Sequence, residues 1–417
     1  MARLLSRPLD RCASLRFCSS VSNSRQFGAP SELNGSQRLL AEYGSRKPAP
    51  LPLRFLKEFG HLHSFNKQLL VSSWLKSELP VRLARRVREL ERLPRALCNM
   101  PSILRIRETY RASFLEIVSF PTFNLIKNKS TNSSSSRRNS TATETKQREQ
   151  IETFVNLLKS IYERHQHVAR DIAYGLLEFK AFNPNIELAE DTVLQEFLNN
   201  FFRSRIAIRL MIGHYISAFE MKKDRVGLIN LQCEPGLLAK KAMEASCELA
   251  KLHYLTQKVP DIVIMGDLET RFPYVDDHVY FCLREILKNS LRAVIENHAD
   301  VSIRKGYPPI TVVVAEGSED VTIRISDLGG GIKQRDISKA LSYAHTTAPP
   351  PRPVSFGSCR TNIFDDNSAG PIAGLGYGLP LSALIARYFG GDIQVMSMEG
   401  AGTDVFLYFP RLDDVKG

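Results

Sequence analysis

The chain has 417 residues, of which 43% are hydrophobic and 24% charged, so it is long enough for two or three domains of ordinary globular composition. No run approaches the roughly 18 apolar residues of a membrane-spanning helix, which excludes a membrane span. The net charge is +12, but ten Lys and Arg against four acids place an excess of six in the first 60 residues. The remainder is only mildly basic, which disfavours a nucleic-acid-binding protein, because such proteins carry a basic face.

The N-terminal stretch is rich in Arg and Ser. Residues 1–25 contain five Arg, six Ser and one acid, and they lack the central apolar core of a secretory signal. This composition is typical of an organellar presequence, and a basic tail without a targeting role is the alternative. We predict a mitochondrial presequence over residues 1–25 and a linker over residues 26–50.

Helical periodicity begins near residue 51. Apolar residues three positions apart predict an amphipathic helix that starts after Pro80, and a further helix follows Pro101 until Pro121 stops it. The Ser-rich stretch 128–147 has too few apolar residues to order itself, so we predict a disordered loop there.

Two further long helices are predicted over about 148–180 and 190–220, because their apolar side chains recur every three to four residues. Long helices that are joined by short or floppy connections pack as antiparallel neighbours. We therefore predict an all-α four-helix bundle over residues 51–225.

Strands and helices interleave over residues 226–412. "DIVIMGD" reads as a short strand, a helix covers about 276–298, and "ITVVVAE" and "VTIRIS" form a hairpin through "GSED". A helix over "LPLSALIARYF" and a closing hairpin over "GDIQVMSMEGAGTDVFLYFP" follow. This order predicts an α+β sandwich with a mixed sheet.

A polar ladder marks the helix over about 276–298. Glu285 and Asn289 are four residues apart and Arg292 is three further on, so all three share one helical face. An exposed polar face on an amphipathic helix is the alternative. In a site, an Asn oxygen suits Mg²⁺, and a neighbouring Glu can deprotonate an attacking hydroxyl.

Three glycine-containing motifs follow the ladder in sequence. In "SDLGGGI" the carboxylate of Asp327 stands at a strand end, where it can accept a hydrogen bond from an adenine amino group. "GLGYGLP" opens a helix and so exposes backbone N–H groups to an anion. "EGAGTD" leads into the last strand. Each motif alone is weak evidence for a site. The polar ladder and the three motifs together, in this order, favour a nucleotide site.

The order E-x-x-K-N, D-x-G-x-G, G-x-G-x-G and G-T resembles the four boxes of the GHKL ATPase superfamily. "SSWLKSELPVRLARRVRELERLP", "RHQHVARDIAYGL", "FFRSRIAIRLMIGHY" and "TTAP" resemble the mitochondrial 2-oxo-acid dehydrogenase kinases, a family within it. The resemblance covers roughly residues 50–412. It implies a GHKL-type ATP-binding sandwich after the bundle, a serine kinase activity, and ATP and Mg²⁺ as cofactors.

The resemblance also assigns roles to individual residues. Glu285 would be the general base, Asn289 the Mg²⁺ ligand and Asp327 the adenine partner. The remaining nucleotide-binding positions would be Lys288, Arg292, Gly329, Gly331, Thr346, Thr347, Gly374, Leu375, Gly376, Tyr377, Gly378, Leu379 and Thr403. Some family members have a histidine four residues before the base, where this chain has Phe281.

The resemblance leaves several functions open. The leading expectation is phosphorylation and inactivation of the E1α subunit of the pyruvate dehydrogenase complex in the mitochondrial matrix. A branched-chain 2-oxo-acid dehydrogenase kinase has the same chemistry, and a non-catalytic nucleotide-binding scaffold is a third possibility. The implied partners are E1α, the lipoyl domain of the E2 core and a second copy of the chain. The family's animal members end in an Asp-Trp pair, whereas the only tryptophan here is Trp74.

Overall fold

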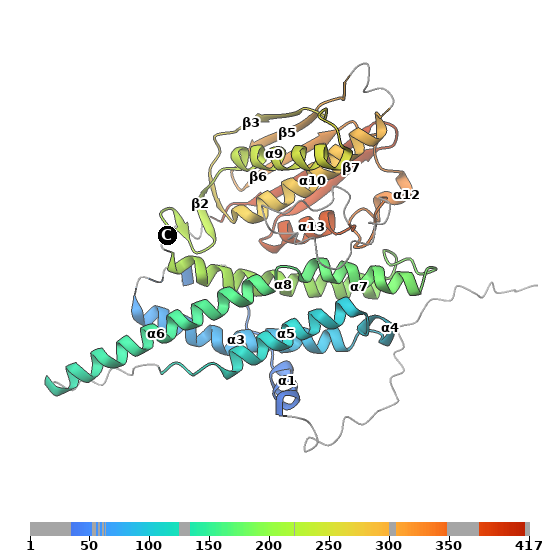
Figure 1. Cartoon of the computed structure of the whole chain (residues 1–417). Helices are drawn as coiled ribbons and strands as arrows, with labels where there is room; N and C mark the ends of the chain where they lie inside the picture. Colours follow the sequence, from blue (N-terminus) through green and yellow to red (C-terminus); the bar gives the residue numbers. More distant parts are fainter. Residues whose placement is uncertain are drawn as a thin grey trace, which may run out of the picture.

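The chain folds into a helical region and a sheet-containing region, which lie one above the other in Figure 1. The computed structural model describes residues 35–51, 56, 59–60, 62, 64–124, 134–220, 222–299, 306–347 and 375–412. The predicted presequence lies outside the described residues, and so does the linker as far as residue 34. No helix within these ranges has the length and apolar character needed to cross a bilayer.

The first described helix occupies a stretch that we predicted as linker. Helix α1 (Gly35–Ser45) packs against α3 (Phe65–Glu91), and Leu40 is buried between them and their neighbours. The ring of Tyr43 meets that of Phe114 edge-on, with centroids 5.6 Å apart. This short helix is therefore held by tertiary contacts, which a search for long periodic runs does not reveal.

Helix α3 also differs from the prediction of a start after Pro80. It begins at Phe65, where Ser64 caps it, and continues through Pro80 to Glu91. A proline inside a helix removes one hydrogen bond and crowds the preceding turn. Here Leu79 and Val81 are buried on either side of Pro80, and packing offsets that cost.

The helices after α3 follow the prediction in part. Helix α4 (Arg95–Cys98) is short, and α5 (Pro101–Ser119) starts at its proline as expected. Helix α6 runs over Ser134–Arg164, so the disordered loop predicted for 128–147 is wrong from Ser134 onward, and 128–133 lie outside the described residues.

The first described side chains of α6 make specific contacts, and a break follows the helix. Ion pairing between Arg148 and Glu144 (2.6 Å) and a bond from buried Gln147 to the carbonyl of Asn124 hold the first described side chains of α6. The helix predicted over 148–180 is broken after Arg164, and the chain resumes as α7 (Val168–Phe182). Helix α8 (Thr192–Phe219), capped by Asp191, lies on top of this layer.

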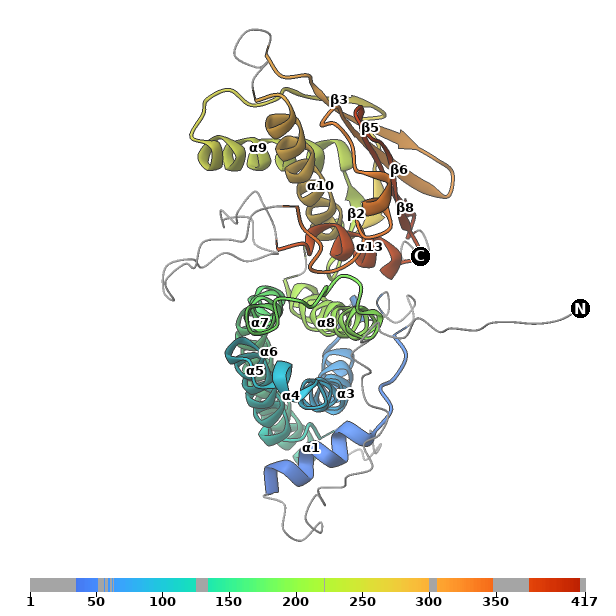
Figure 2. The same cartoon turned by 90° about the vertical axis from the view of Figure 1, so that its right-hand side faces the viewer.

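These helices form one α-helical region, which is seen end-on in Figure 2. Helix α3 packs against α5, α5 against α7, and α6 against α8. The shared core is apolar and aromatic, with Tyr110, Phe114, Phe154 and Phe201 all fully buried. The predicted all-α character of this region is confirmed.

The second region is built on a five-stranded sheet of order β3-β5-β6-β8-β7. Strand β3 runs parallel to β5, and the other neighbours are antiparallel, so the sheet is mixed as predicted. The strand bounds are β3 Ile262–Gly266, β5 Ile310–Glu316, β6 Asp320–Asp327, β7 Asp392–Met398 and β8 Gly402–Pro410. Both predicted hairpins are confirmed.

A smaller three-stranded sheet lies beside the large one. Its strands are β1 (Arg225–Val226), β2 (Ile229–Cys233) and β4 (Phe272–Tyr274), in that spatial order. It joins α8 to the sheet region and leads the chain into the helix that carries the polar ladder.

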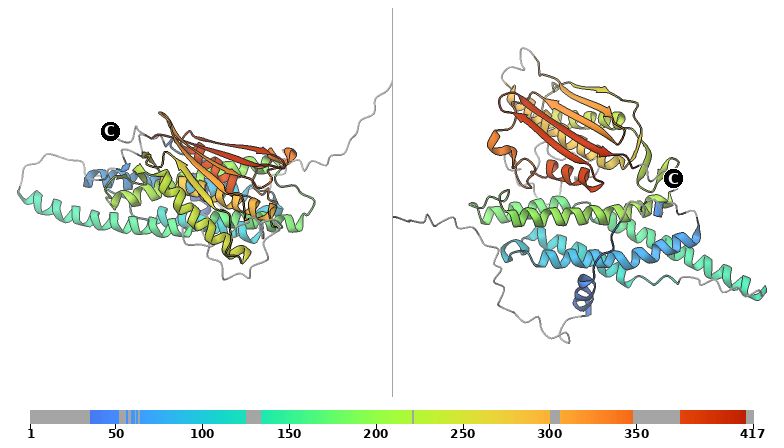
Figure 3. Two further views of the ribbon diagram at one scale, coloured as in Figure 1. Left: turned by 90° about the horizontal axis from the view of Figure 1, so that it is seen from above. Right: turned by 180° about the vertical axis from the view of Figure 1, so that it is seen from behind.

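Helices cover one face of the five-stranded sheet (Figure 2). They are α9 (Pro235–Tyr254), α10 (Asp276–Asn297) and α13 (Gly378–Tyr388), while α12 (Gln334–Ile337) is a single turn. Alternate residues of the strands, such as Val312, Ile323 and Leu407, are buried beneath these helices. The other face of the sheet carries no helix in the view from behind in Figure 3. An α+β sandwich is thereby confirmed.

Candidate functional site

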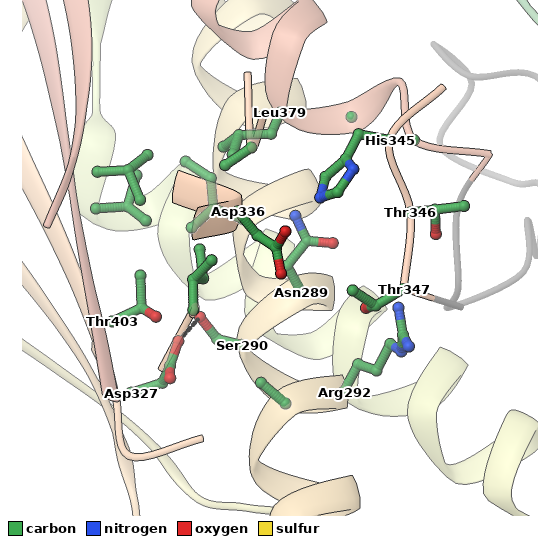
Figure 4. A pocket seen from close by; sticks show the side chains of 18 of the residues that line it. Asn289, Ser290, Arg292, Asp327, Asp336, His345, Thr346, Thr347, Leu379 and Thr403 are labelled. Carbon is green, nitrogen blue, oxygen red and sulfur yellow. Dashed lines mark hydrogen bonds between the residues drawn. The ribbon is translucent and has the colours of Figure 1, made fainter. Parts of the chain in front are cut away.

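The predicted polar ladder of α10 faces a cavity of about 520 Å³ (Figure 4). Its walls are α10, the segment after β6 with α12, the loop 343–347, the start of α13 and strand β8. The predicted site residues that line it are Glu285, Lys288, Asn289, Arg292, Asp327, Gly331, Thr346, Thr347, Gly376, Gly378, Leu379 and Thr403. The fold thus gathers segments that are more than 100 residues apart in the chain.

One end of the cavity is built around Asp327, the last residue of β6. Its carboxylate accepts a hydrogen bond from Ser290 Oγ (2.7 Å) and another from the backbone N–H of Gly329 (3.0 Å). Burial raises the pKa of Asp327, and these hydrogen bonds oppose the rise because they favour the charged form. The result is a fixed acceptor at a strand end.

Glu285 lies deeper in the cavity, where α10 meets the start of α13. Its Oε1 forms an ion pair of 2.5 Å with Lys288 Nζ, and both side chains are only about a tenth exposed. The thiol of Cys282, one turn before, bonds to the carbonyl of Ser382 (3.6 Å) on α13. Burial, reinforced by the charge of Glu285, raises the pKa of this thiol to about 12, so it stays protonated.

Asn289 and Arg292 continue the ladder along α10. Figure 4 shows the side chains of Asn289, Asp336 and His345 pointing toward one another, from α10, α12 and the loop 343–347. Arg292 lies on the Thr347 side of the cavity, and its guanidinium forms an ion pair of 2.9 Å with Glu296. Polar groups on three separate elements therefore face the same space.

Two glycines are required where α13 begins. Gly378 is the first residue of α13, and a Cβ added there would collide with Glu285 Oε2. Gly376 has φ +78°, and a Cβ there would come within 2.5 Å of the His345 carbonyl oxygen. The glycines therefore bring a helix N-terminus, with its unpaired N–H groups, against the cavity wall.

The two ends of the cavity suit different chemical groups. Asp327 and Ser290 offer a directional acceptor with a hydroxyl beside it, which suits a ring amino group. The opposite end combines the Lys288 ammonium, the Asn289 amide and a helix N-terminus, which suits phosphate groups. An elongated, polarised cavity of this kind fits a nucleotide.

Comparison with known proteins agrees with this geometry. Residues 50–230 match the family model of the mitochondrial branched-chain alpha-ketoacid dehydrogenase kinase, and residues 274–413 match that of the histidine kinase-, DNA gyrase B- and HSP90-like ATPases. The mitochondrial pyruvate dehydrogenase (acetyl-transferring) kinase of Arabidopsis thaliana is 34% identical over 89% of this chain and 93% of its own length. The chain belongs to the mitochondrial 2-oxo-acid dehydrogenase kinase family.

Two other relatives are similar to this chain over most of its length. The corresponding kinase of Schizosaccharomyces pombe is 34% identical over 90% of this chain and 95% of its own length. The human pyruvate dehydrogenase kinase isozyme 3 is 32% identical over 89% of this chain and 85% of its own length. The chain is thus a protein kinase of the GHKL superfamily whose cavity lies in an ATP-binding domain.

Three described residues among the predicted site residues of this kinase do not line the cavity. Gly329 packs against Ala293, and its N–H donates a hydrogen bond to the Asp327 carboxylate. Tyr377 is buried against the ring of Phe202 on α8 and that of Tyr343, and Leu375 packs on the core. Gly374 lies outside the described residues. The second glycine motif therefore includes residues that shape the loop rather than face the cavity.

Sequence reasoning missed several residues that line the cavity. Ser290 is next to Asn289, yet its hydroxyl donates a hydrogen bond to Asp327, which is 37 residues away in the chain. Asp336 and His345 come from a one-turn helix and an irregular loop, where no periodicity predicts direction. The position of His345 directly before the two predicted threonines was the one signal available.

Proposed function

We propose that this kinase phosphorylates, and so inactivates, the E1α subunit of the pyruvate dehydrogenase complex in the mitochondrial matrix. The observation that carries the proposal is the placement of Glu285 and Asn289 one helical turn apart in the cavity wall, with Asp327 at the far end. The relatives named pyruvate dehydrogenase kinase, at 31–34% identity, supply the substrate class.

The transfer step follows from these positions. Asp327 accepts a hydrogen bond from the adenine amino group, and the N-terminus of α13 holds the phosphates. The target serine oxygen bonds to the γ-phosphorus as the bond to the ADP oxygen breaks. Glu285 takes the serine proton, and Lys288 keeps the Glu285 carboxylate in place through the ion pair.

The donor set at the phosphate end fits Mg²⁺. This hard cation binds one or two protein oxygens together with phosphates and waters. Asn289 faces the cavity, and the Asp336 carboxylate points to the same place in Figure 4. Asn289 would hold the ion, with Asp336 as a second oxygen donor. Bound there, Mg²⁺ would neutralise phosphate charge during the transfer.

A branched-chain 2-oxo-acid dehydrogenase E1α is the second candidate substrate. The family model that matches residues 50–230 bears that name, and this observation favours it. The chemistry at Glu285 would be the same, because the acceptor would again be a serine hydroxyl. The relatives named pyruvate dehydrogenase kinase favour the pyruvate complex.

A homodimer is proposed on the uncovered face of the sheet. Met396 and Met398 on β7 are 61% and 71% exposed, and Val263 and Met265 on β3 are 42% and 44% exposed. Exposed apolar side chains at both edges of one sheet face are typical of an interface. The view from behind in Figure 3 shows this face, with the red strands β7 and β8 in front and the helices behind the sheet.

The lipoyl domain of the E2 core is proposed as a second partner. A cavity of about 250 Å³ lies between Leu51 and Leu56, Leu210 of α8, and Tyr388 and Phe389 at the end of α13. Its size and lining suit the aliphatic arm of a lipoyl group.

The domain organisation is proposed as residues 51–225 for the helical domain and 226–412 for the kinase domain. In a four-helix bundle α3, α5 and α8 would be three members, and α6 continued by α7 would be the fourth. A presequence over residues 1–25 is tested by fusing residues 1–40 to a reporter, which should enter mitochondria.

The substrate proposal is tested with labelled ATP and purified E1 complexes. We expect the chain to label E1α of the pyruvate complex faster than that of the branched-chain complex, and to inactivate the former. The Glu285→Gln variant serves as the control for contaminating kinases. Preferential labelling of branched-chain E1α would select the second substrate, and no labelling of either by a chain that binds ATP would favour a nucleotide-binding scaffold.

A further inference from the structure

The loop 343–347 is held in place from the helical region. Gln195 on α8 accepts a hydrogen bond from the Tyr343 N–H (2.8 Å) and donates one to the Tyr343 carbonyl (3.1 Å). The Tyr343 hydroxyl donates to Asn199 Oδ1 (3.1 Å), and its ring stacks on Phe202 with centroids 5.3 Å apart. The start of the loop is therefore fixed by protein contacts alone.

The next residue turns the chain toward the cavity. Ala344 has φ +62°, a left-handed conformation that residues with a Cβ rarely adopt. Its N–H donates to the carbonyl of Gly376 (3.1 Å), and Gly376 in turn lies so close to the His345 backbone that no Cβ would fit. Strained residues that are held in this way cluster at functional sites.

The consequence is the direction of His345. Its imidazole points into the cavity beside Asn289, at the end opposite Asp327 (Figure 4). With adenine at Asp327, a nucleotide extends its phosphates toward Asn289 and His345. The helical region and the strained Ala344 thus place an imidazole where the phosphates lie.

On the basis of the proposed function, we propose that His345 is a further binding residue for the nucleotide. One imidazole N–H donates a hydrogen bond to a non-bridging oxygen of the phosphate chain. Hydrogen bonds to charged oxygens are among the stronger ones, and either tautomer of a histidine offers one N–H. Gln195, which does not reach the cavity, is a positioning residue for this contact.

The proposal is tested by calorimetry with two ligands, MgATP and adenosine, on the full chain. His345→Phe keeps a ring of similar size and removes the donor, so it should weaken MgATP binding about 10-fold and change adenosine binding less than about 2-fold. His345→Gln, which restores an N–H donor, should recover part of the MgATP affinity. His253→Phe makes the same change at an exposed position of α9, and this variant should bind both ligands like the wild type.

The outcomes separate this inference from the proposed function. If wild type binds neither ligand, the nucleotide site itself is wrong. If wild type binds MgATP and His345→Phe weakens both ligands equally, or neither, the phosphate contact is wrong while the nucleotide site stands. Gln195→Met is a second test, because it removes the hydrogen bonds to Tyr343. This variant should also weaken MgATP binding more than adenosine binding. Equal loss of both ligands there would contradict the positioning role.

Discussion

The helical region and the nucleotide cavity both bury charged side chains, but they use them differently. In the helical region Arg205 is fully buried, and its Nη2 donates to the carbonyls of His165 (3.0 Å) and Gln166 (3.1 Å). In the cavity Glu285 and Lys288 are almost as buried, yet they line about 520 Å³ of space. Burial alone therefore does not distinguish a structural charge from a functional one.

The difference lies in what each charge contacts. The carbonyls that Arg205 binds belong to the break between α6 and α7, where a helix C-terminus leaves acceptors free. The guanidinium thus completes the backbone hydrogen bonding of a bend. Glu285 instead has one carboxylate oxygen on Lys288 and the other against Gly378, at a wall built by three elements. Changes at the two places should separate stability from function.

The largest expected effect is on catalysis. Glu285→Gln keeps the shape of the side chain but cannot take a proton, so the rate of E1α phosphorylation should fall by roughly 10²–10⁴. MgATP affinity should stay near that of the wild type. The measurement is single-turnover phosphorylation beside calorimetry on the same protein.

Asn289→Ala is the counterpart of that variant. It should lose Mg²⁺-dependent nucleotide binding, because the ion links the protein to the phosphates. Near wild-type phosphorylation by Glu285→Gln would show that this side chain only positions groups. Unchanged binding of MgATP by Asn289→Ala would remove Asn289 as the metal ligand.

The next effect belongs to the helical region. Arg205→Met has a similar length but leaves the carbonyls of His165 and Gln166 without this donor. We expect the free energy of unfolding to fall by about 2–4 kcal/mol, since hydrogen bonds to charged groups are worth about 1.5–3 kcal/mol each. Urea unfolding measures it, and adenosine affinity measured below the transition should not change. A large loss of adenosine affinity would break the distinction between the two regions.

Asp327→Ala should act in the opposite way. It removes one charge-assisted hydrogen bond to adenine, worth roughly 1.5–3 kcal/mol, so ATP and adenosine should both bind on the order of 10- to 100-fold more weakly. Because the change opens space beside a cavity, the free energy of unfolding should fall less than for Arg205→Met. Calorimetry decides the first point, and unchanged affinity would remove Asp327 from the site.

Local sequence patterns predicted the five strands of the larger sheet, but not α9 or the three-stranded sheet. The β5–β6 and β7–β8 hairpins follow from alternation of apolar residues around short turns, which depends on neighbours only. In the helical region the start of α3 and the break after Arg164 were missed. Both depend on tertiary contacts. Packing of the residues on either side of Pro80 offsets the cost of a proline inside α3, and Arg205 from α8 donates hydrogen bonds to the carbonyls at the break.

The candidate site likewise contains residues that the sequence predicted and residues that it did not. Glu285, Asn289 and Arg292 were predictable as one face because helical spacing fixes their direction. Asp327 was predictable because it ends an alternating strand. His345 and Asp336 were not, because their directions come from the left-handed Ala344 and from a single helical turn. Resemblance supplied Thr346 and Thr347 beside them without supplying those two.

The smallest expected effect is a loss of folding stability in acid, to which a buried histidine in each region contributes. Burial lowers the pKa of His165 to about 3, helped by Arg205, Arg209 and Arg164, and burial lowers the pKa of His278 to about 4. Each histidine is therefore neutral in the folded chain and titrates near 6.5 when unfolded. The unfolded state binds more protons below pH 6.5, so stability is complete above that pH and falls as the pH decreases toward 4.

At pH 5.5 each histidine should cost about 1.4 kcal/mol relative to pH 8, which urea unfolding at the two pH values measures. His165→Gln and His278→Gln should each remove about half of their combined share of that dependence, although one side chain lies in the helical region and the other in α10. Both regions then lose stability in acid for the same reason, namely a neutral imidazole enclosed by protein. If His165→Gln left the pH dependence unchanged while His278→Gln abolished it, acid sensitivity would belong to the kinase domain alone, and the ring of His165 would have to be solvated in solution.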